Sequence, residues 1–221
     1  MITLVIEAAT YAGSVALVNV DRVLGERSVA MRGREHEALM PAVAEVLEAA
    51  SVPVTQLERI VCGAGPGSFT SLRIAGGIAK GLALAAGIPL VPVSSLALLM
   101  ASGESLASGR YLAAIDALRG EHYAAGFEVA AAGEIAWASD VALLPSAELG
   151  EFATRLGAQL VVAGATTTGS TTPHARAAAR LTKMIESITP ADLAAWEPAY
   201  GRLAEAQVKW EAAHGRPLAN A

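Results

Sequence analysis

A glycine-rich turn between an apolar strand and an unusual helix constrains the fold of this chain more than any other stretch. Arg59 to Ala64 carries apolar, β-branched residues and predicts a buried strand, and Gly65-Pro66-Gly67 predicts a turn. Ser68 is a typical N-cap residue, so we expect a helix from about Phe69 to Ala86. The sequence therefore predicts a strand–turn–helix unit.

The predicted helix contains glycines, which helices normally avoid. Gly76, Gly77 and Gly81 lie inside it, and each costs about 1 kcal/mol relative to alanine. Small residues also recur every four positions, at Ala75, Ala79, Ala83 and Gly87. Such rows allow a second backbone to approach closely. Either the helix packs tightly on its own sheet, or one small-residue face meets that sheet while another meets a partner, and both interpretations can hold together.

Composition indicates a globular chain with a large core. Its 221 residues are 53% hydrophobic but only 5% aromatic, which suits two small domains or one large domain with a core of small and branched side chains. The single cysteine, Cys62, lies in the predicted strand and is expected to be a buried, inert thiol. Without a disulfide framework, we expect a reducing cytoplasm.

Charge and hydropathy exclude two classes of function. A formal net charge of −5 argues against tight autonomous binding of nucleic acid. Met1 to Val20 is apolar but carries Glu7 and breaks at Gly13-Ser14, so we expect neither a signal peptide nor a membrane span there. The sequence therefore predicts no membrane association.

The first half of the chain predicts a three-stranded meander followed by alternating helices and strands. The first strand, Ile2 to Ile6, ends at the acidic residue Glu7. The other expected elements are strands over Ser14 to Val20, Gly25 to Ala30 and Ile88 to Val93, a helix from Leu39 to Ala50, and a short helix capped by Ser94-Ser95 that ends near Met100.

The same pattern returns after the small, polar segment from Ser102 to Gly109. Tyr111 to Ile115 predicts a strand that again ends in an acid, Asp116. The elements expected after it are strands over 123–129, 134–138 and 159–163, a loop over 164–173, and helices over 146–156, 175–188, from Asp192, and over 204–214. We therefore predict two subdomains, residues 1–103 and 104–221, with the last helix packing back on either half.

Two copies of this plan resemble the actin-like (ribonuclease H-like) ATPase superfamily, an α/β fold of mixed sheets flanked by helices. In such ATPases the two first-strand acids flank a cleft and help to hold metal and phosphates. The corresponding ends here are Glu7-Ala8-Ala9-Thr10 and Asp116-Ala117-Leu118-Arg119. Neither has the Asp-x-Gly turn that brings backbone amides onto phosphate, so we do not expect the chain alone to be a working ATPase.

A closer resemblance begins at the glycine-rich turn. The run from Gly63 to Thr70 (GAGPGSFT), followed by Leu72-Arg73-Ile74 and by Ala79 to Ala83, resembles the TsaB (YeaZ) family, a subunit of bacterial tRNA threonylcarbamoyladenosine biosynthesis. The similarity continues at 34–37, 39, 41, 93–96, 116–117, 119–121, 123, 197–198, 200 and 202. Two residues depart from the family pattern: Ser71 stands where Gly is usual, and Glu7 where Asp is usual.

The resemblance implies a catalytically inactive subunit without a cofactor of its own. Its implied partners are the ATP-using subunit TsaD, which would hold ATP and metal, and the ATPase TsaE, with tRNA reached only through the complex. Together they transfer a threonylcarbamoyl group to the adenosine beside the anticodon. Alone, the chain would pair with itself. In the family the helices corresponding to 39–50 and 69–86 build the dimer interface.

These considerations lead to a set of predicted partner-binding residues and to no predicted catalytic residue. The predicted residues are His36, Arg73, Gly76, Gly77, Lys80, Gly81 and Leu84. The four histidines are scattered singly, so we expect no histidine metal site. The alternatives are a serine peptidase, if His36 reaches Ser68 or Ser71 in space, and an ATP-dependent transferase or kinase that uses Glu7 and Asp116 around a metal nucleotide.

Overall fold

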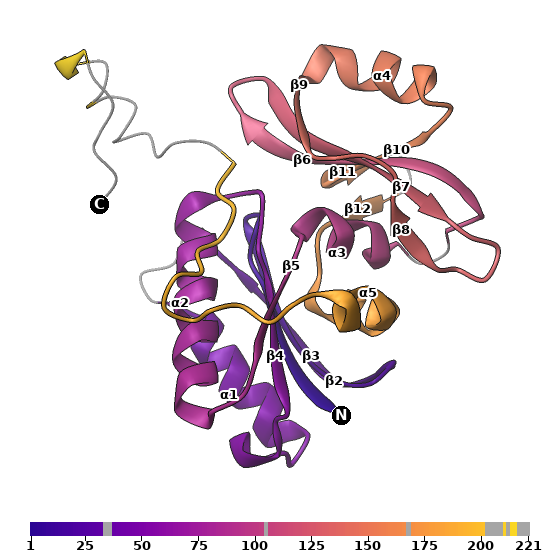
Figure 1. The fold of residues 1–221 in the computed structure, drawn as a ribbon. Coiled ribbons are helices and arrows are strands. Elements are labelled where there is room, and N and C mark those ends of the chain that lie inside the picture. Colours follow the sequence, from indigo (N-terminus) through magenta and orange to yellow (C-terminus); the bar gives the residue numbers. More distant parts are fainter. Residues whose placement is uncertain (33–36, 104–105, 167–168, 202–209, 211–212, 216–221) are drawn as a thin grey trace.

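The computed structural model has two lobes, each built on a mixed sheet (Figure 1). The structure describes residues 1–32, 37–103, 106–166, 169–201, 210 and 213–215. The predicted α/β architecture of two actin-like subdomains, mixed sheets flanked by helices, is confirmed.

The first lobe contains the predicted meander and the two strands that follow it. Its sheet has the order β3-β2-β1-β4-β5. These strands are β1 (Ile2–Glu7), β2 (Ala12–Asn19), β3 (Arg22–Ala30), β4 (Arg59–Gly63) and β5 (Leu90–Val93). β1, β2 and β3 pair antiparallel, whereas β4 pairs parallel with both β1 and β5. The turn after β4 therefore lies beside the end of β1.

Two helices cover one face of this sheet, α1 (Leu39–Ala49) and α2 (Phe69–Ala86). The line of small residues in α2 faces the strands, because Ala75, Ala79 and Ala83 are completely buried. Short side chains bring the helix close to the sheet, and the helix ends at Gly87, whose φ of +66° suits a residue without Cβ. The predicted strand–turn–helix unit is confirmed.

The second lobe repeats the plan in a shorter form. Its sheet contains β6 (Gly109–Leu118), β7 (Glu121–Val129), β8 (Ile135–Trp137), β9 (Ala142–Pro145) and β10 (Gln159–Val162). β10 pairs parallel with β6, as β4 does with β1. A 3₁₀ turn, η2 (Ser146–Glu148), leads into α4 (Leu149–Arg155), which packs on the outer face of the sheet.

The largest core cluster joins the two lobes. It contains α3 (Ser95–Ser102), the 3₁₀ helix η3 (Ala175–Arg180) and α5 (Thr182–Ser187), together with apolar residues of both sheets. Every residue of α3 from Ser95 to Ala101 is buried, as expected for a helix that is apolar on all sides. As predicted, the Ser94 side chain caps this helix by accepting a hydrogen bond from the Leu96 amide.

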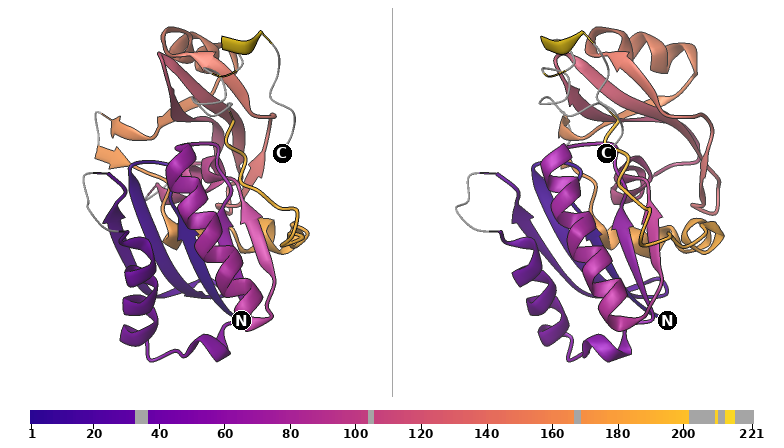
Figure 2. Two further views of the ribbon diagram at one scale, coloured as in Figure 1. Left: turned by 90° about the vertical axis from the view of Figure 1, so that its left-hand side faces the viewer. Right: turned by 60° about the vertical axis from the view of Figure 1, so that its left-hand side comes forward.

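The residues after the second sheet return to the first lobe. The two sheets lie on either side of the predicted boundary at 103/104, but the Ala175 amide donates to Ser14 Oγ in β2 at 2.9 Å. Further along, the Ala191 amide donates to the Leu90 carbonyl in β5. Figure 2 shows this returning segment passing beside α2 and reaching the second lobe.

Several predicted elements are wrong in detail. The helix predicted over 175–188 is η3 followed by α5. The loop predicted over 164–173 contains a hairpin of β11 (Gly164–Thr166) and β12 (Gly169–Thr171). The helix expected from Asp192 is only a turn. Short 3₁₀ segments and two-stranded hairpins carry weak periodic signals. A further 3₁₀ turn, η1 (Val54–Gln56), was not predicted. Most of the helix predicted over 204–214 lies outside the described residues.

Candidate functional site

The most unusual surface lies on the outer face of α2. Positions 73, 77, 81 and 84 fall on the side of the helix opposite its buried alanines. A Cβ atom added at Gly77 or Gly81 would meet no atom within 4 Å, and the Leu84 side chain is 75% exposed. We call Arg73, Gly77, Gly81 and Leu84 the open face. All four residues are exposed, and no other part of the described chain comes within 4 Å of the two glycine Cβ positions.

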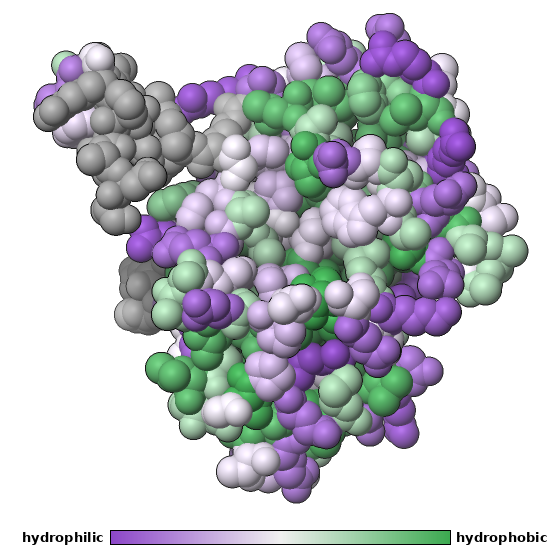
Figure 3. All heavy atoms as spheres, in the orientation of Figure 1, coloured by the Kyte–Doolittle hydropathy of each residue, from purple (hydrophilic) through white to green (hydrophobic). Residues whose placement is uncertain are grey.

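The two flanks of α2 are occupied. Ile74, Ile78 and Leu82 pack with the core cluster that also includes residues of α1. On the other flank, a Cβ at Gly76 would lie 3.1 Å from Pro198 Cγ, and Lys80 Nζ donates to the Trp196 carbonyl at 2.9 Å. Apolar residues also reach the surface on the lower left of Figure 3, where α1 and α2 lie.

Two of the predicted partner-binding residues are already in contact with another part of the chain. Gly76 is buried beneath the chain's own Pro198, and the ammonium group of Lys80 is used inside the chain. Both residues therefore hold the returning segment rather than offering a free surface. Arg73, Gly77, Gly81 and Leu84 are placed together on the open face, whereas His36 lies outside the described residues.

A second feature is a cleft between the lobes, with a volume of about 1000 Å³. Its walls carry three of the four tyrosines of the chain and one phenylalanine: Tyr11, Phe69, Tyr123 and Tyr200. Arg32, Arg119 and Asp116 supply its charged side chains. The guanidinium of Arg32 stacks on the Tyr11 ring, with Cζ 3.3 Å from the ring centroid.

The two first-strand acids do not share this cleft. Asp116 lines it and accepts a hydrogen bond from the Leu118 amide at 2.7 Å. Glu7 is completely buried, with Oε1 accepting from the Ala9 amide and Oε2 from Ser95 Oγ. Burial raises the pKa of Glu7 to about 7, against the lowering effect of these hydrogen bonds. The carboxyl of Glu7 therefore cannot hold a metal nucleotide in the cleft as placed.

The glycine-rich turn also packs closely against the end of the first strand. The Ser68 amide donates to the Ala9 carbonyl at 2.7 Å, and a Cβ at Gly67 would lie 2.2 Å from the same oxygen. The Ser68 amide is therefore directed to the protein itself, whereas Phe69 and Thr70 at the start of α2 line the cleft. No group of three or more potential metal ligands occurs among the residues that the structure describes. These donor sets do not fit a metal-bound triphosphate.

The two serines of the alternative peptidase interpretation, Ser68 and Ser71, bond to each other. Ser68 occupies the N-cap position of α2, but its hydroxyl lies 3.0 Å from Ser71 Oγ and does not cap the helix. Ser71, which departs from the family pattern, is buried. The sequence prediction that Ser68 acts by capping is therefore wrong, because its hydroxyl is paired with that of Ser71.

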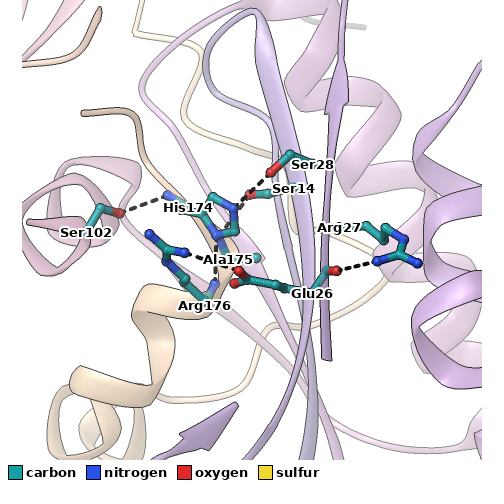
Figure 4. A network of polar contacts seen from close by, with 8 residues as sticks. All are labelled: Ser14, Glu26, Arg27, Ser28, Ser102, His174, Ala175 and Arg176. Atoms are coloured by element: carbon teal, nitrogen blue, oxygen red, sulfur yellow. Dashed lines mark hydrogen bonds and ion pairs between the residues drawn. The ribbon is translucent and has the colours of Figure 1, made fainter. Parts of the chain in front are cut away.

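The structure also brings together a serine and a histidine that the sequence did not suggest (Figure 4). Ser28 Oγ lies 3.0 Å from His174 Nε2, across 146 residues of chain. His174 Nδ1 accepts a hydrogen bond from the Arg176 amide, so the ring proton is on Nε2 and is donated to Ser28. In this tautomer His174 is not a general base for Ser28. The pair joins β3 to η3 and has a structural role.

A family model and curated relatives match this chain. Residues 30–161 match the model described as tRNA N6-adenosine threonylcarbamoyltransferase (TsaD). The chain is 43% identical over 125 residues to "tRNA threonylcarbamoyladenosine biosynthesis protein TsaB" of Escherichia coli, an alignment that covers 55% of this chain and 53% of that protein. The Bacillus subtilis protein of the same name is 35% identical over 123 residues, covering 56% and 53%. The alignments thus span about half the length of these relatives.

Solved structures extend the similarity to almost the whole chain. A Pseudomonas aeruginosa protein described as similar to peptidase YeaZ superposes with a TM-score of 0.74 at 28% identity, covering 91% of this chain and 99% of that one. YeaZ from Pseudomonas aeruginosa superposes with a TM-score of 0.71 at 27% identity, covering 90% and 99%. The two-lobed arrangement is therefore shared by these proteins.

Proposed function

Because the chain belongs to the TsaD family whose model it matches, as a protein of the TsaB/YeaZ type, we propose that it acts in tRNA threonylcarbamoyladenosine biosynthesis as a non-catalytic subunit. In this proposal it pairs with a TsaD-like subunit and supports that partner's transfer of a threonylcarbamoyl group to tRNA. A TsaE-like ATPase completes the system, and the setting is the cytoplasm.

One observation carries this proposal: the open face of α2. Gly77 and Gly81 each lower helix stability by about 1 kcal/mol relative to alanine, yet no part of the described chain approaches them. Two glycines that no intramolecular contact requires are explained if a partner backbone lies against them. The exposed Leu84 next to them supplies an apolar contact.

The cleft supports the assignment of the chemistry to the partner. The buried Glu7 and the close packing of Gly67 on Ala9 leave Asp116 as the one first-strand acid that lines the cleft. We therefore propose that ATP and metal bind to the TsaD-like subunit. The acidic net charge of −5 agrees with contact to tRNA only through the complex. In the absence of a partner, the open face would pair with that of a second copy.

A binding measurement with a matched control tests the proposal. Gly81→Leu places a branched side chain on the open face and should reduce capture of a TsaD-like subunit at least tenfold. Gly150→Leu is the control, because Gly150 also lies in a helix, α4, with no atom near its Cβ position. Equal capture by the two variants would remove the open face as the partner site. ATP binding with turnover by the isolated chain would instead support an ATP-dependent enzyme.

A further inference from the structure

Residues 191–201, which we call the strap, run antiparallel to α2 and connect the two lobes. At one end the Ala191 amide donates to the Leu90 carbonyl, at the edge of the first sheet. In the middle the Trp196 carbonyl accepts from Lys80 Nζ, and near the other end the Ala199 amide donates to the Ala64 carbonyl at 2.7 Å. Figure 2 shows the strap alongside α2 over most of its length.

Glycines make room for the strap at three positions. A Cβ at Gly65 would lie 2.5 Å from the Ala199 carbonyl oxygen, and one at Gly76 would lie 3.1 Å from Pro198 Cγ. Gly201, with a φ of +76°, lies so close to Tyr123 that a Cβ there would be 2.5 Å from the ring. The strap is therefore seated in contacts that no other residue type permits without rearrangement, which indicates a defined path rather than a loose tail.

The upper end of the strap belongs to the wall of the cleft. The Tyr200 ring packs at a tilt against Phe69, the first residue of α2, with ring centroids 4.5 Å apart and an interplanar angle of 48°. The Tyr123 hydroxyl, from β7 of the second lobe, donates to the Tyr200 carbonyl at 3.3 Å. One short segment thus contacts the start of α2 and the second sheet at once, at the mouth of the cavity.

Lys80 connects this segment to the open face. It lies in α2 between Gly77 and Gly81, one turn before Leu84, and its half-buried ammonium group holds the middle of the strap. A partner pressed against Gly77 and Gly81 would contact the helix turn that carries this anchor. A shift of that turn would alter the hydrogen bond from Lys80 to the Trp196 carbonyl, four residues before Tyr200.

We propose that the strap couples docking of the partner on the open face to the relative placement of the two lobes. This inference rests on the proposed function for the identity of the partner. The coupling element is residues 191–201, its lower anchor is Lys80 and its upper anchor is Tyr123. Partner binding then tightens the strap and fixes the width of the cleft, and loosening the upper anchor weakens partner binding at a distance.

Hydrogen exchange of the full chain measures the anchors. Lys80→Met keeps the length of the side chain and removes its donor, and Tyr123→Phe removes only the hydroxyl. Each should speed exchange of the Ala199 amide about tenfold. Lys183→Met and Tyr11→Phe are the controls, because Lys183 pairs with Glu134 away from the strap, and Tyr11 lies in the same cleft against Arg32.

The double variant decides whether the anchors act through one segment. If the strap is a single coupled unit, the Lys80→Met/Tyr123→Phe variant exchanges at about the rate of the faster single variant, since the strap is already released. Rates that multiply to about a hundredfold would mean independent local effects and would overturn the proposal.

Partner affinity tests the coupling itself. Tyr123→Phe should weaken binding of the TsaD-like subunit by threefold to tenfold, although Tyr123 is in the second lobe, while Tyr11→Phe leaves it unchanged. Wild-type affinity in the Tyr123→Phe variant would overturn the coupling. Failure of the proposed function is distinguishable, because Gly81→Leu would then bind the partner normally, whatever the strap variants do.

Discussion

Glu7 Oε2 accepts a hydrogen bond from Ser95 Oγ at 2.9 Å, and the same serine oxygen accepts from the Gly65 amide at 3.1 Å. The buried carboxyl at the end of β1 therefore supports the turn that leads into α2. Its other oxygen, Oε1, holds the Ala9 amide, and the Ala9 carbonyl accepts from Ser68. The Glu7 carboxyl is thus connected by hydrogen bonds to two residues just before α2, Gly65 through Ser95 and Ser68 through Ala9.

Glu7 should make the protein less stable as pH rises through neutrality. Burial raises its pKa from 4.5 to about 7, so between these values the folded state binds a proton that the unfolded state does not. The contribution of this proton to the free energy of unfolding is fully present below pH 4.5 and is lost as pH rises through about 7. The total loss is roughly 3 kcal/mol. Urea unfolding at pH 5 and pH 8 measures the loss.

The matched variants for this prediction are Glu7→Gln and Glu48→Gln. Glutamine at position 7 retains the size and an acceptor for the Ala9 amide but does not titrate, so that variant should lose much less stability between pH 5 and pH 8. Glu48 is exposed in α1, and its replacement should retain the wild-type pH dependence. An unchanged slope in Glu7→Gln would exclude Glu7 as its source.

Gly63→Ala should be strongly destabilising, because of Glu7. A Cβ at position 63 would lie 1.8 Å from Glu7 Oε2, so the carboxyl must leave its hydrogen bond with Ser95. We expect a loss of about 2–3 kcal/mol in the free energy of unfolding. In a Glu7→Ala background the same change should cost much less, since the nearest remaining atom is Ser95 Oγ, at 3.2 Å from the Cβ position. Additive effects of the two substitutions in urea unfolding would contradict this explanation.

The sequence predicts the local structure around α2 better than its surroundings. The glycine-proline-glycine turn precedes the helix and Gly87 ends it, so the bounds Phe69–Ala86 are predicted correctly, although the Ser68 side chain does not cap the helix as expected. The strap was not predicted, because its contacts join residues far apart in sequence, such as Ala64 with Ala199. The helix predicted from Asp192 is only a turn, and no periodic pattern in residues 191–201 shows where the segment binds.

The glycines of α2 show the same limit. All three carry the same local signal, a weak helix former inside a helix. Successive residues point about 100° apart around the helix axis, so Gly76 faces the strap while Gly77 faces away from it. Only the position of the strap distinguishes the two. For this reason the sequence groups Gly76 and Lys80 with the open face, whereas in the structure both contact the strap.

His174 should make the protein less stable on acidification. Burial lowers its pKa, an effect that the charge of Glu26 opposes and that of Arg176 adds to. Below about pH 6.5 the imidazole of the unfolded chain therefore binds a proton more readily than that of the folded chain. The contribution of His174 to the free energy of unfolding is fully present above about pH 6.5 and falls as the pH decreases below it. Protonation also breaks the bond from the Arg176 amide to Nδ1. The trend is opposite to that of Glu7.

The variant His174→Asn isolates this contribution. Asparagine is a good N-cap and can accept from the Arg176 amide, but it does not titrate. The difference in unfolding free energy between wild type and variant should therefore change between pH 7.5 and pH 5.5, in favour of the variant at the lower pH. His122→Asn serves as the control, because His122 is outside this network and bonds to Ser146. A constant difference across this range would contradict the prediction.

Replacing each of the three glycines of α2 by alanine should change stability differently on the open face and on the side of the helix that faces the strap. Gly77→Ala and Gly81→Ala should each raise the free energy of unfolding by about 1 kcal/mol, because alanine favours the helix and its methyl group meets open space. Gly76→Ala should gain less or lose stability, since its methyl group would lie 3.1 Å from Pro198. Urea unfolding of the isolated chain, at concentrations low enough that it is monomeric and the open face is not paired with a second copy, measures all three. Equal gains at 76, 77 and 81 would mean that the strap does not press on α2. A loss at 77 or 81 would mean that another part of the molecule already covers the open face.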